Sequence, residues 1–182
     1  YSHYKAGIEA VENALGIVPP LNAKLTRSLM SMALFMHDHV VHFYHLHGLD
    51  WVDIVSALDA DEKKASNEAF KDADFPIATG ENDLKKVKTR VKECVEKGQL
   101  GPFANAYWGH KTYRLSSEQN LILLSHYLKA LEVQRDLANL MAIFGGKQPH
   151  PQSLRVGGVT CIMDLLDPSR MGEYLTLFKN AA

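Results

Sequence analysis

The stretch "SSEQNLILLSHYLKALEVQRDLANLMAIFGG", Ser116 to Gly146, decides the fold. Its apolar residues recur at helical spacing, and it contains no proline. Ser116 and Gln119 have the spacing of a capping box, which starts a helix, and the glycine pair that follows Phe144 is typical of a helix end. The stretch therefore predicts one long helix from Ser116 to Phe144, much longer than an ordinary strand.

Outward from this stretch, helical spacing continues through most of the chain. We predict a short helix closed by Gly16, a long helix from Asn22 to Leu58, a charged connector with a short helix from Asp59 to Asp83, a helix from Asp83 to Lys97, an irregular aromatic segment, an extended piece "LRVGGVTC" and a last helix capped by Asp167-Pro168. The predicted fold class is all-α, a bundle of long helices with irregular loops and little β. We expect residues 1–182 to form a single helical unit.

Composition excludes several classes of protein. The 182 residues include 46% hydrophobic side chains, which is ordinary for one globular domain with a sizeable core. The 20 basic residues balance 21 acidic ones and form no dense basic stripe, so no nucleic-acid partner is expected. No window of about 20 apolar residues exists, so no transmembrane segment is expected. Cys94 and Cys161 form no C-x-x-C pair.

Five of the nine histidines lie in "HDHVVHFYHLHGLDW", His37 to Trp51. At about 100° per residue, Asp38, His42 and His45 would share one otherwise apolar stripe of a helix. Such polar groups need partners or a polar site. They could be hydrogen-bonded core side chains, or they could face a metal or a substrate. The chain has no Glu-x-x-His pattern on paired helices, which argues against a dinuclear carboxylate site.

A further histidine, His150, stands between Pro149 and Pro151 in "IFGGKQPHPQ". The fixed φ angles of the prolines stiffen the backbone and would project the imidazole from a rigid turn. A solvent-facing loop histidine is the simpler interpretation. Flanking prolines are useful where an imidazole must be held still.

In the order and spacing of four stretches, the chain resembles the large, catalytic subunit of nickel–iron hydrogenases, including the nickel–iron–selenium branch of that family. The stretches are "HDHVVHFYHLHGLDWVD", "GQLGPFANAYWGH", "HYLKALEVQRDLANLMAIFGGKQPHPQ" and "VGGVTC". The resemblance covers most of the chain, and only the charged connector from Asp59 to Asp83 matches nothing in particular.

The resemblance implies roles for five residues. The opening "YSHYKAG" lacks an initiator methionine and looks like the continuation of the R-x-C-G-x-C-x-x-x-H motif, so His3 matches the histidine beside a metal-binding cysteine. Asp38 matches the catalytic carboxylate above the open site between nickel and iron. His42 and His45 are candidates for a polar shell or for proton transfer around it. His150 matches the histidine beside an iron–sulfur cluster of the partner subunit.

The same resemblance implies a function. The whole protein would reversibly cleave dihydrogen to protons and electrons at a nickel–iron centre. None of the metal ligands is expected within these residues, which would form a central fragment, inactive when produced alone. Partners would be a small subunit that holds iron–sulfur clusters, in a heterodimer, and an electron carrier such as a cytochrome. The location would be periplasmic or membrane-associated.

Two other classes of protein stay open at this point. One is a helical metal- or quinone-binding subunit of a respiratory complex related to hydrogenases. The other is a non-catalytic scaffold whose histidines are structural. Metal analysis of the full-length protein separates the three, since only a hydrogenase requires nickel together with iron.

Overall fold

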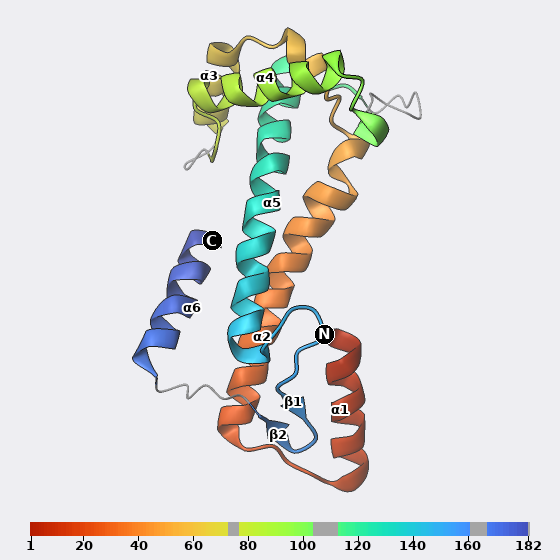
Figure 1. The fold of residues 1–182 in the computed structure, drawn as a ribbon, viewed down its shortest axis with the longest axis vertical. Helices are drawn as coiled ribbons and strands as arrows, with labels where there is room; N and C mark the ends of the chain where they lie inside the picture. The colour runs from red at the N-terminus through yellow and green to blue at the C-terminus, as the bar shows by residue number, and fades with distance from the viewer. Residues whose placement is uncertain (73–76, 104–112, 161–166, 182) are drawn as a thin grey trace. The chain divides into compact units, whose positions relative to one another are not determined.

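Helices dominate the computed structural model, which describes residues 1–72, 77–103, 113–160 and 167–181 (Figure 1). The elements, in chain order, are α1 (Ser2–Leu15), α2 (Leu21–Val40), a π-helix η1 (Val41–Leu46), two 3-10 turns η2 (Gly48–Asp50) and η3 (Ser56–Asp59), α3 (Glu62–Asp72), α4 (Glu81–Glu96), a 3-10 turn η4 (Gly101–Phe103), α5 (Ser117–Gly145), the strands β1 (Leu154–Arg155) and β2 (Gly158–Val159), and α6 (Pro168–Ala181). The two strands pair antiparallel in the described part of the chain. The predicted all-α class is confirmed.

The chain divides into two compact units. Unit 1 comprises Tyr1–Val40 with Glu132–Ala182, and unit 2 comprises Val41–Leu131. Helix α5 contributes its first half to unit 2 and its second half to unit 1. That residues 1–182 act as a single helical unit stays a prediction.

Helix α5 begins and ends where the sequence predicts. The hydroxyl of Ser116 accepts a hydrogen bond from the backbone N–H of Gln119 at 3.2 Å, and the side-chain oxygen of Gln119 accepts one from the backbone N–H of Ser116 at 3.1 Å. This reciprocal pair is a capping box. After the last helical residue, Gly145, the chain turns at Gly146 with φ 81°, which suits glycine.

The predicted single helix from Asn22 to Leu58 is wrong. Helix α2 ends at Val40 and passes into the π-helix Val41–Leu46, and only short 3-10 turns follow. A π-helix bonds residue i to i+5, so each turn takes up more residues than in an α-helix. The 100° wheel that aligned Asp38 with His42 and His45 therefore does not apply beyond Val40.

Unit 1 has its core where α2 meets the second half of α5, with α6 and the hairpin packed against them. The largest fully buried side chains there are Phe144, Met30, Leu137, Leu140, Met141 and Leu154. The ring of Tyr174 on α6 lies 5.1 Å from that of Phe144. The prediction that the two long helices pack together is confirmed for this part of α2.

A buried ion pair joins three elements of unit 1. Two guanidinium nitrogens of Arg27 on α2 donate to the carboxylate of Glu12 on α1, at 2.9 and 2.7 Å. One of them also donates to the carbonyl oxygens of Arg155 and Gly158, at 2.8 and 3.0 Å. The Glu12 carboxylate accepts a further bond from the backbone N–H of Gly157 at 2.8 Å. The pair thus holds the hairpin against α1 and α2.

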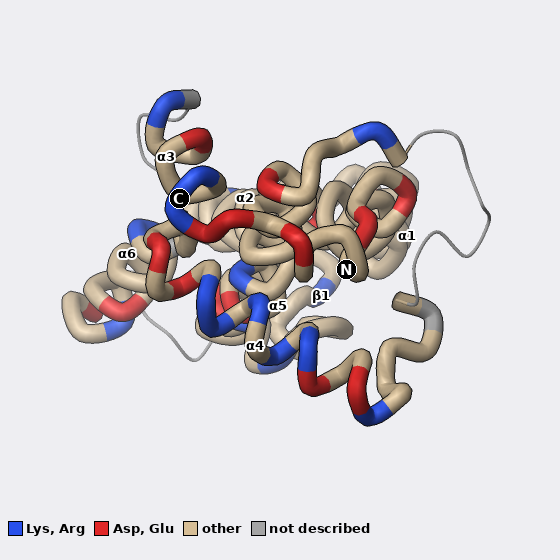
Figure 2. Tube along the Cα trace, turned by 90° about the horizontal axis from the view of Figure 1, so that it is seen from above, with Lys and Arg blue, Asp and Glu red and all other residues tan. Residues whose placement is uncertain are grey.

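Unit 2 has its own core, formed by α3, α4, η3 and the first half of α5. Its most buried apolar residues include Leu84, Leu121, Ala65 and Ala57. Helix α4 carries acidic residues at both ends and basic residues between them (Figure 2), and several pair within the helix, as Lys85 does with Glu81 at 2.6 Å. Among the described residues, no helix is both long and apolar enough to cross a membrane.

We predict that Glu12→Gln destabilises unit 1 of the full-length protein. The change keeps the shape of the side chain but leaves the guanidinium of Arg27 buried without its counter-charge. The control is Glu9→Gln, which removes an i,i+4 ion pair with Lys5 and should lower the free energy of unfolding by about 0.3–0.5 kcal/mol at most. Glu12→Gln should lower the free energy of unfolding several times more. Thermal unfolding of both variants measures the difference.

We expect the difference in stability between wild type and Glu12→Gln to become smaller at acidic pH. The hydrogen bonds from Arg27 hold the pKa of the Glu12 carboxyl below its ordinary value. The ion pair therefore contributes fully above the ordinary glutamate pKa, and its contribution is lost as the pH falls through the lowered one. Wild type and Glu12→Gln should converge in stability well below about pH 4. Equal unfolding temperatures at neutral pH would contradict a stabilising role for the pair.

Candidate functional site

The carboxylate of Asp38 lies near the end of α2 in unit 1. Its Oδ1 is 3.2 Å from Nδ1 of the neighbouring His37, and its side chain is 62% exposed. The expectation of a carboxylate on a buried apolar stripe is therefore not met within this chain. His39 on the next position bonds the carbonyl oxygen of Phe35 at 2.7 Å. Asp38 is thus available to a group that approaches from outside these residues.

The remaining histidines of the cluster lie in unit 2. His42 is exposed, and its ring lies 4.6 Å from that of His47. Nδ1 of His47 is 3.1 Å from a carboxylate oxygen of Asp50. The structure brings His42 together with His47, which the sequence did not predict. His42 and His47 are both exposed to solvent in this chain.

His45 has a different environment, since it is half-buried against α5. Its ring meets that of Tyr127 edge to face, with centroids 4.9 Å apart and planes at 89°. Its Nε2 is buried and has no hydrogen-bond partner among the described residues. A buried imidazole nitrogen without a partner is costly. This residue therefore fits the predicted polar shell better than the exposed His42 does.

A second partly buried histidine, which the sequence analysis did not single out, lies on α5. His126 on α5 lies edge to face with Tyr44 at 6.4 Å. Burial lowers the pKa of His126, although a hydrogen bond with the backbone of Ile77 partly opposes this shift. Burial likewise raises the pKa values of Tyr44 and Tyr127. The sequence contains two adjacent Tyr–His pairs, Tyr44-His45 and His126-Tyr127. Nothing in either segment indicates that the two pairs lie close together in the fold.

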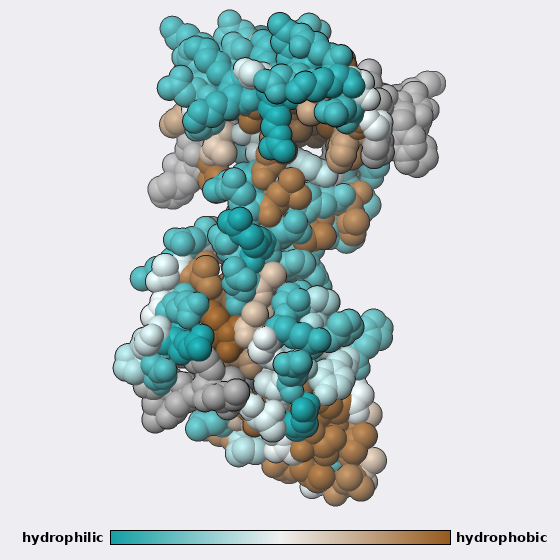
Figure 3. Space-filling view, in the orientation of Figure 1, coloured by the Kyte–Doolittle hydropathy of each residue, from teal (hydrophilic) through white to brown (hydrophobic). Residues whose placement is uncertain are grey.

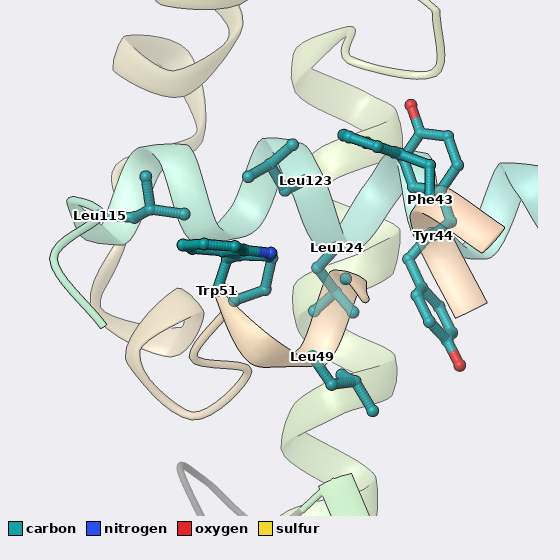
Figure 4. A pocket seen from close by; sticks show the side chains of 10 residues that line it. Phe43, Tyr44, Leu49, Trp51, Leu115, Leu123 and Leu124 are labelled. Atoms are coloured by element: carbon teal, nitrogen blue, oxygen red, sulfur yellow. The ribbon is translucent and has the colours of Figure 1, made fainter. Parts of the chain in front are cut away.

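An apolar pocket of about 300 Å³ opens beside these rings in unit 2. It is lined by Phe43, Tyr44, Gly48, Leu49, Trp51, Val52, Leu115, Leu123, Leu124 and Tyr127. Trp51 lies near Leu115 and Leu123, while Phe43 and Tyr44 lie together at the other end (Figure 4). Phe43 and Trp51 are 62% and 53% exposed and form its rim. No described residue that lines the pocket is charged, so it suits an apolar group.

His150 lies in a tight turn after α5 in unit 1. The backbone N–H groups of Gln152 and Ser153 both donate to the carbonyl oxygen of Gly145, at 2.7 and 3.3 Å, and close the turn. His150 has φ 61°, in the left-handed region where histidine is enriched among non-glycine residues. It is exposed, whereas Pro151 is buried. The turn therefore projects the imidazole outward, as the flanking prolines predicted.

Potential metal ligands are dispersed in the described part of the chain. His3 is exposed in the first turn of α1, and Cys94 is half-buried on α4. No three histidine, cysteine, aspartate or glutamate side chains of the described residues come together in a way that could hold a metal ion. Cys161 lies outside the described residues.

Comparison with known proteins now gives the class. The family model for nickel-dependent hydrogenases matches residues 1–182, so the chain belongs to that family. The quinone-reactive Ni/Fe-hydrogenase large chain of Wolinella succinogenes is 71% identical over 182 residues, which are 100% of this chain and 32% of that protein. The uptake hydrogenase large subunit of Rhizobium leguminosarum bv. viciae is 53% identical over 160 residues, which are 88% of this chain and 26% of that one.

Solved structures agree with this assignment. The [NiFeSe]-hydrogenase of Dm. baculatum matches 91% of this chain and 26% of its own, with 26% sequence identity and a TM-score of 0.52. The chain thus spans about a third or less of the length of these relatives. The family named by the resemblance is confirmed. The roles of Asp38, His3, His42, His45 and His150 stay predictions.

Proposed function

We propose that this chain is part of the catalytic large subunit of a nickel–iron hydrogenase, which reversibly cleaves dihydrogen to protons and electrons. The observation that carries the proposal is 71% identity, over all 182 residues, with a Ni/Fe-hydrogenase large chain. That relative is named quinone-reactive, which favours quinone as the final electron acceptor. The electrons would first pass to iron–sulfur clusters of a small subunit and then to a carrier such as a cytochrome. Its location would be periplasmic or membrane-associated.

The described residues bring no group of three or more potential metal ligands together. In the proposed enzyme the ligands of the metal centre lie in other parts of the subunit. What these residues contribute is a shell that positions proton carriers and excludes water around a reacting centre.

Asp38 is the residue proposed to handle the proton. Its carboxylate is exposed in this chain and has only the adjacent His37 as a hydrogen-bond partner among the described contacts. A carboxylate oxygen can accept a proton directly or hold a water that does so. His3 and the half-buried His45 would shape the polar surroundings, and the exposed His42 would exchange protons with solvent.

His150 is proposed to lie beside an iron–sulfur cluster of the small subunit. Its outward position on a closed turn supports this role, because a rigid imidazole can tune a neighbouring redox centre by hydrogen bonding. We expect cysteine ligands without selenium, because the Ni/Fe relative is 71% identical and the [NiFeSe]-hydrogenase is 26% identical to this chain.

Purification of the full-length protein with its small subunit tests the proposal. We expect nickel and iron in the same preparation and dihydrogen oxidation with a viologen dye, whereas reduction of a soluble quinone should also require the electron carrier; selenium is measured alongside. A respiratory-complex subunit without hydrogenase activity would lack nickel, and a scaffold protein would lack both metals. Either result would remove the hydrogenase proposal.

For Asp38→Asn, we expect nickel and iron to be retained while dihydrogen oxidation falls. The amide keeps the shape of the side chain but removes the charge and the basic oxygen. If Asp38 is the base itself, the loss should be about a hundredfold or more; if it positions a water, the loss should be smaller. Assays across pH, with metal content verified, measure the effect.

Asp59→Asn is the matched control, because Asp59 is an exposed aspartate at the end of η3. It should behave as wild type. If Asp38→Asn also keeps wild-type activity with an unchanged pH profile, the proposed proton role of Asp38 is wrong.

For His150→Ala, we expect slower electron transfer with unchanged metal content. Isotope exchange between dihydrogen and deuterated water should continue, since it needs no electron to leave the active site. The midpoint potential of the nearest cluster in the small subunit should shift. Gln152→Ala, an exposed neighbour on the same turn, should leave the potential unchanged. An unshifted potential in His150→Ala would exclude the proposed contact.

A further inference from the structure

The two loops of unit 1 that follow helices α1 and α5 differ in how they are packed. The connection from α1 to α2 leaves apolar side chains such as Val18 and Leu21 exposed, and Figure 3 shows a hydrophobic area at the lower end of the view, over this connection. The turn after α5 instead packs on its own helix, because Pro151 and Ser153 are both buried. Contacts within the described residues therefore set the position of this turn.

Gly145, the last residue of α5, is the point at which the turn meets the helix. Its carbonyl oxygen accepts the two hydrogen bonds that close the turn, from the backbone N–H groups of Gln152 and Ser153 at 2.7 and 3.3 Å. Gly145 is buried and helical, and its φ angle is not positive, in contrast to that of Gly146. Any residue could adopt its backbone conformation, so the reason for a glycine must lie in the space around it.

That space is already filled. A Cβ atom at position 145 would lie 2.8 Å from Cβ of Pro151 and 3.4 Å from Sδ of Met30 on α2. The unbranched side chain of Met30 can adapt, but Cβ of Pro151 belongs to a ring that is closed onto the backbone. Carbon atoms pack at about 3.5–4.0 Å, so an alanine at position 145 would push the backbone of the turn away by roughly 0.7 Å or more.

His150 would move together with Pro151, because it directly precedes it. Its backbone has φ 61°, a region that few non-glycine residues adopt, and the following proline restricts it further. The backbone of His150 therefore has little freedom to compensate for a displaced Pro151. A hydrogen bond from an imidazole N–H has a narrow range of lengths, about 2.7–3.2 Å, so a shift of this size is enough to lose it.

We infer that Gly145 is a positioning residue for His150: the absence of a side chain lets Pro151 pack against the end of α5, and this close approach sets where the imidazole projects. The inference rests on the proposed role of His150 beside an iron–sulfur cluster of the small subunit. Gly145 makes no contact with that cluster in this proposal and acts only through Pro151 and His150.

Gly145→Ala in the complete heterodimer tests the inference. Nickel and iron should be retained, and isotope exchange between dihydrogen and deuterated water should continue. Electron transfer to an external acceptor should fall at least several-fold. The midpoint potential of the nearest cluster should shift in the same direction as in His150→Ala, since both changes remove the same imidazole contact. A wild-type potential in Gly145→Ala, alongside a shifted one in His150→Ala, would overturn the inference.

Gly7→Ala is the matched control. Gly7 also lies in a helix of unit 1, α1, but a Cβ atom there would meet no atom of the described residues within 4 Å. The potential and the rate of electron transfer should therefore stay at their wild-type values. A shift as large as that in Gly145→Ala would mean that the contact with Pro151 is not the cause, which would also overturn the inference.

Pro151→Gly separates the specific contact from a general loss of folding. It removes the Cβ atom that an alanine at position 145 would meet, so Gly145→Ala should change the potential less in this background than in wild type. If Gly145→Ala alone does not fold, the double variant should restore the folded subunit, with a potential closer to wild type than that of His150→Ala. Equal effects in both backgrounds, or no recovery of folding, would contradict the inference.

Failure here can be told apart from failure of the proposed function. An unchanged potential in His150→Ala would remove the proposed role of His150 and this inference with it. A shifted potential in His150→Ala, without one in Gly145→Ala, would remove this inference alone. Nickel content and dihydrogen oxidation of the unmodified enzyme test the hydrogenase proposal independently of both variants.

Discussion

The buried pair of Glu12 and Arg27 is the interaction on which unit 1 depends. Each charge has lost its water, and each is compensated by the other and by backbone groups of the hairpin. Such a pair contributes little net stability compared with apolar packing, but removal of one partner leaves a buried charge. Its main effect is therefore geometric, because its hydrogen bonds hold α1, α2 and the hairpin together. The turn that carries His150 precedes the same hairpin, so its position follows from that arrangement.

Local rules predicted the parts of the fold that depend on few residues. The capping box of α5 needs only Ser116 and Gln119, and both of its hydrogen bonds form. The glycine at the end of α1 and the Asp167-Pro168 start of α6 are equally local. The Glu12–Arg27 pair could not be predicted, because its members are separated by 15 residues and their third partner is the hairpin near the other end of the chain.

The histidine cluster shows where a helical wheel stops being valid. In an α-helix residue i bonds to residue i+4, and in a π-helix it bonds to residue i+5. The spacing of apolar residues along the sequence does not distinguish these two patterns over a few residues. This change of bonding pattern separates Asp38 on α2 from His42 and His45 on the π-helix. The sequence singled out the right segment but not the environment of each side chain. His126 could not be foreseen either, because its importance depends on which segment of the chain packs against α5.

The division of the chain also bears on how it folds during synthesis. Unit 2 is continuous in sequence, whereas unit 1 combines the first 40 residues with those after residue 131. Met30 of α2, for example, belongs to the same core as Leu137, Leu140 and Phe144 of α5. The ribosome would therefore release all of unit 2 before the second part of unit 1 is synthesised. Until then, the apolar face of α2 would remain exposed. Contacts between residues so distant in sequence form slowly, so α2 stays open to misfolding and to chaperone binding during that time.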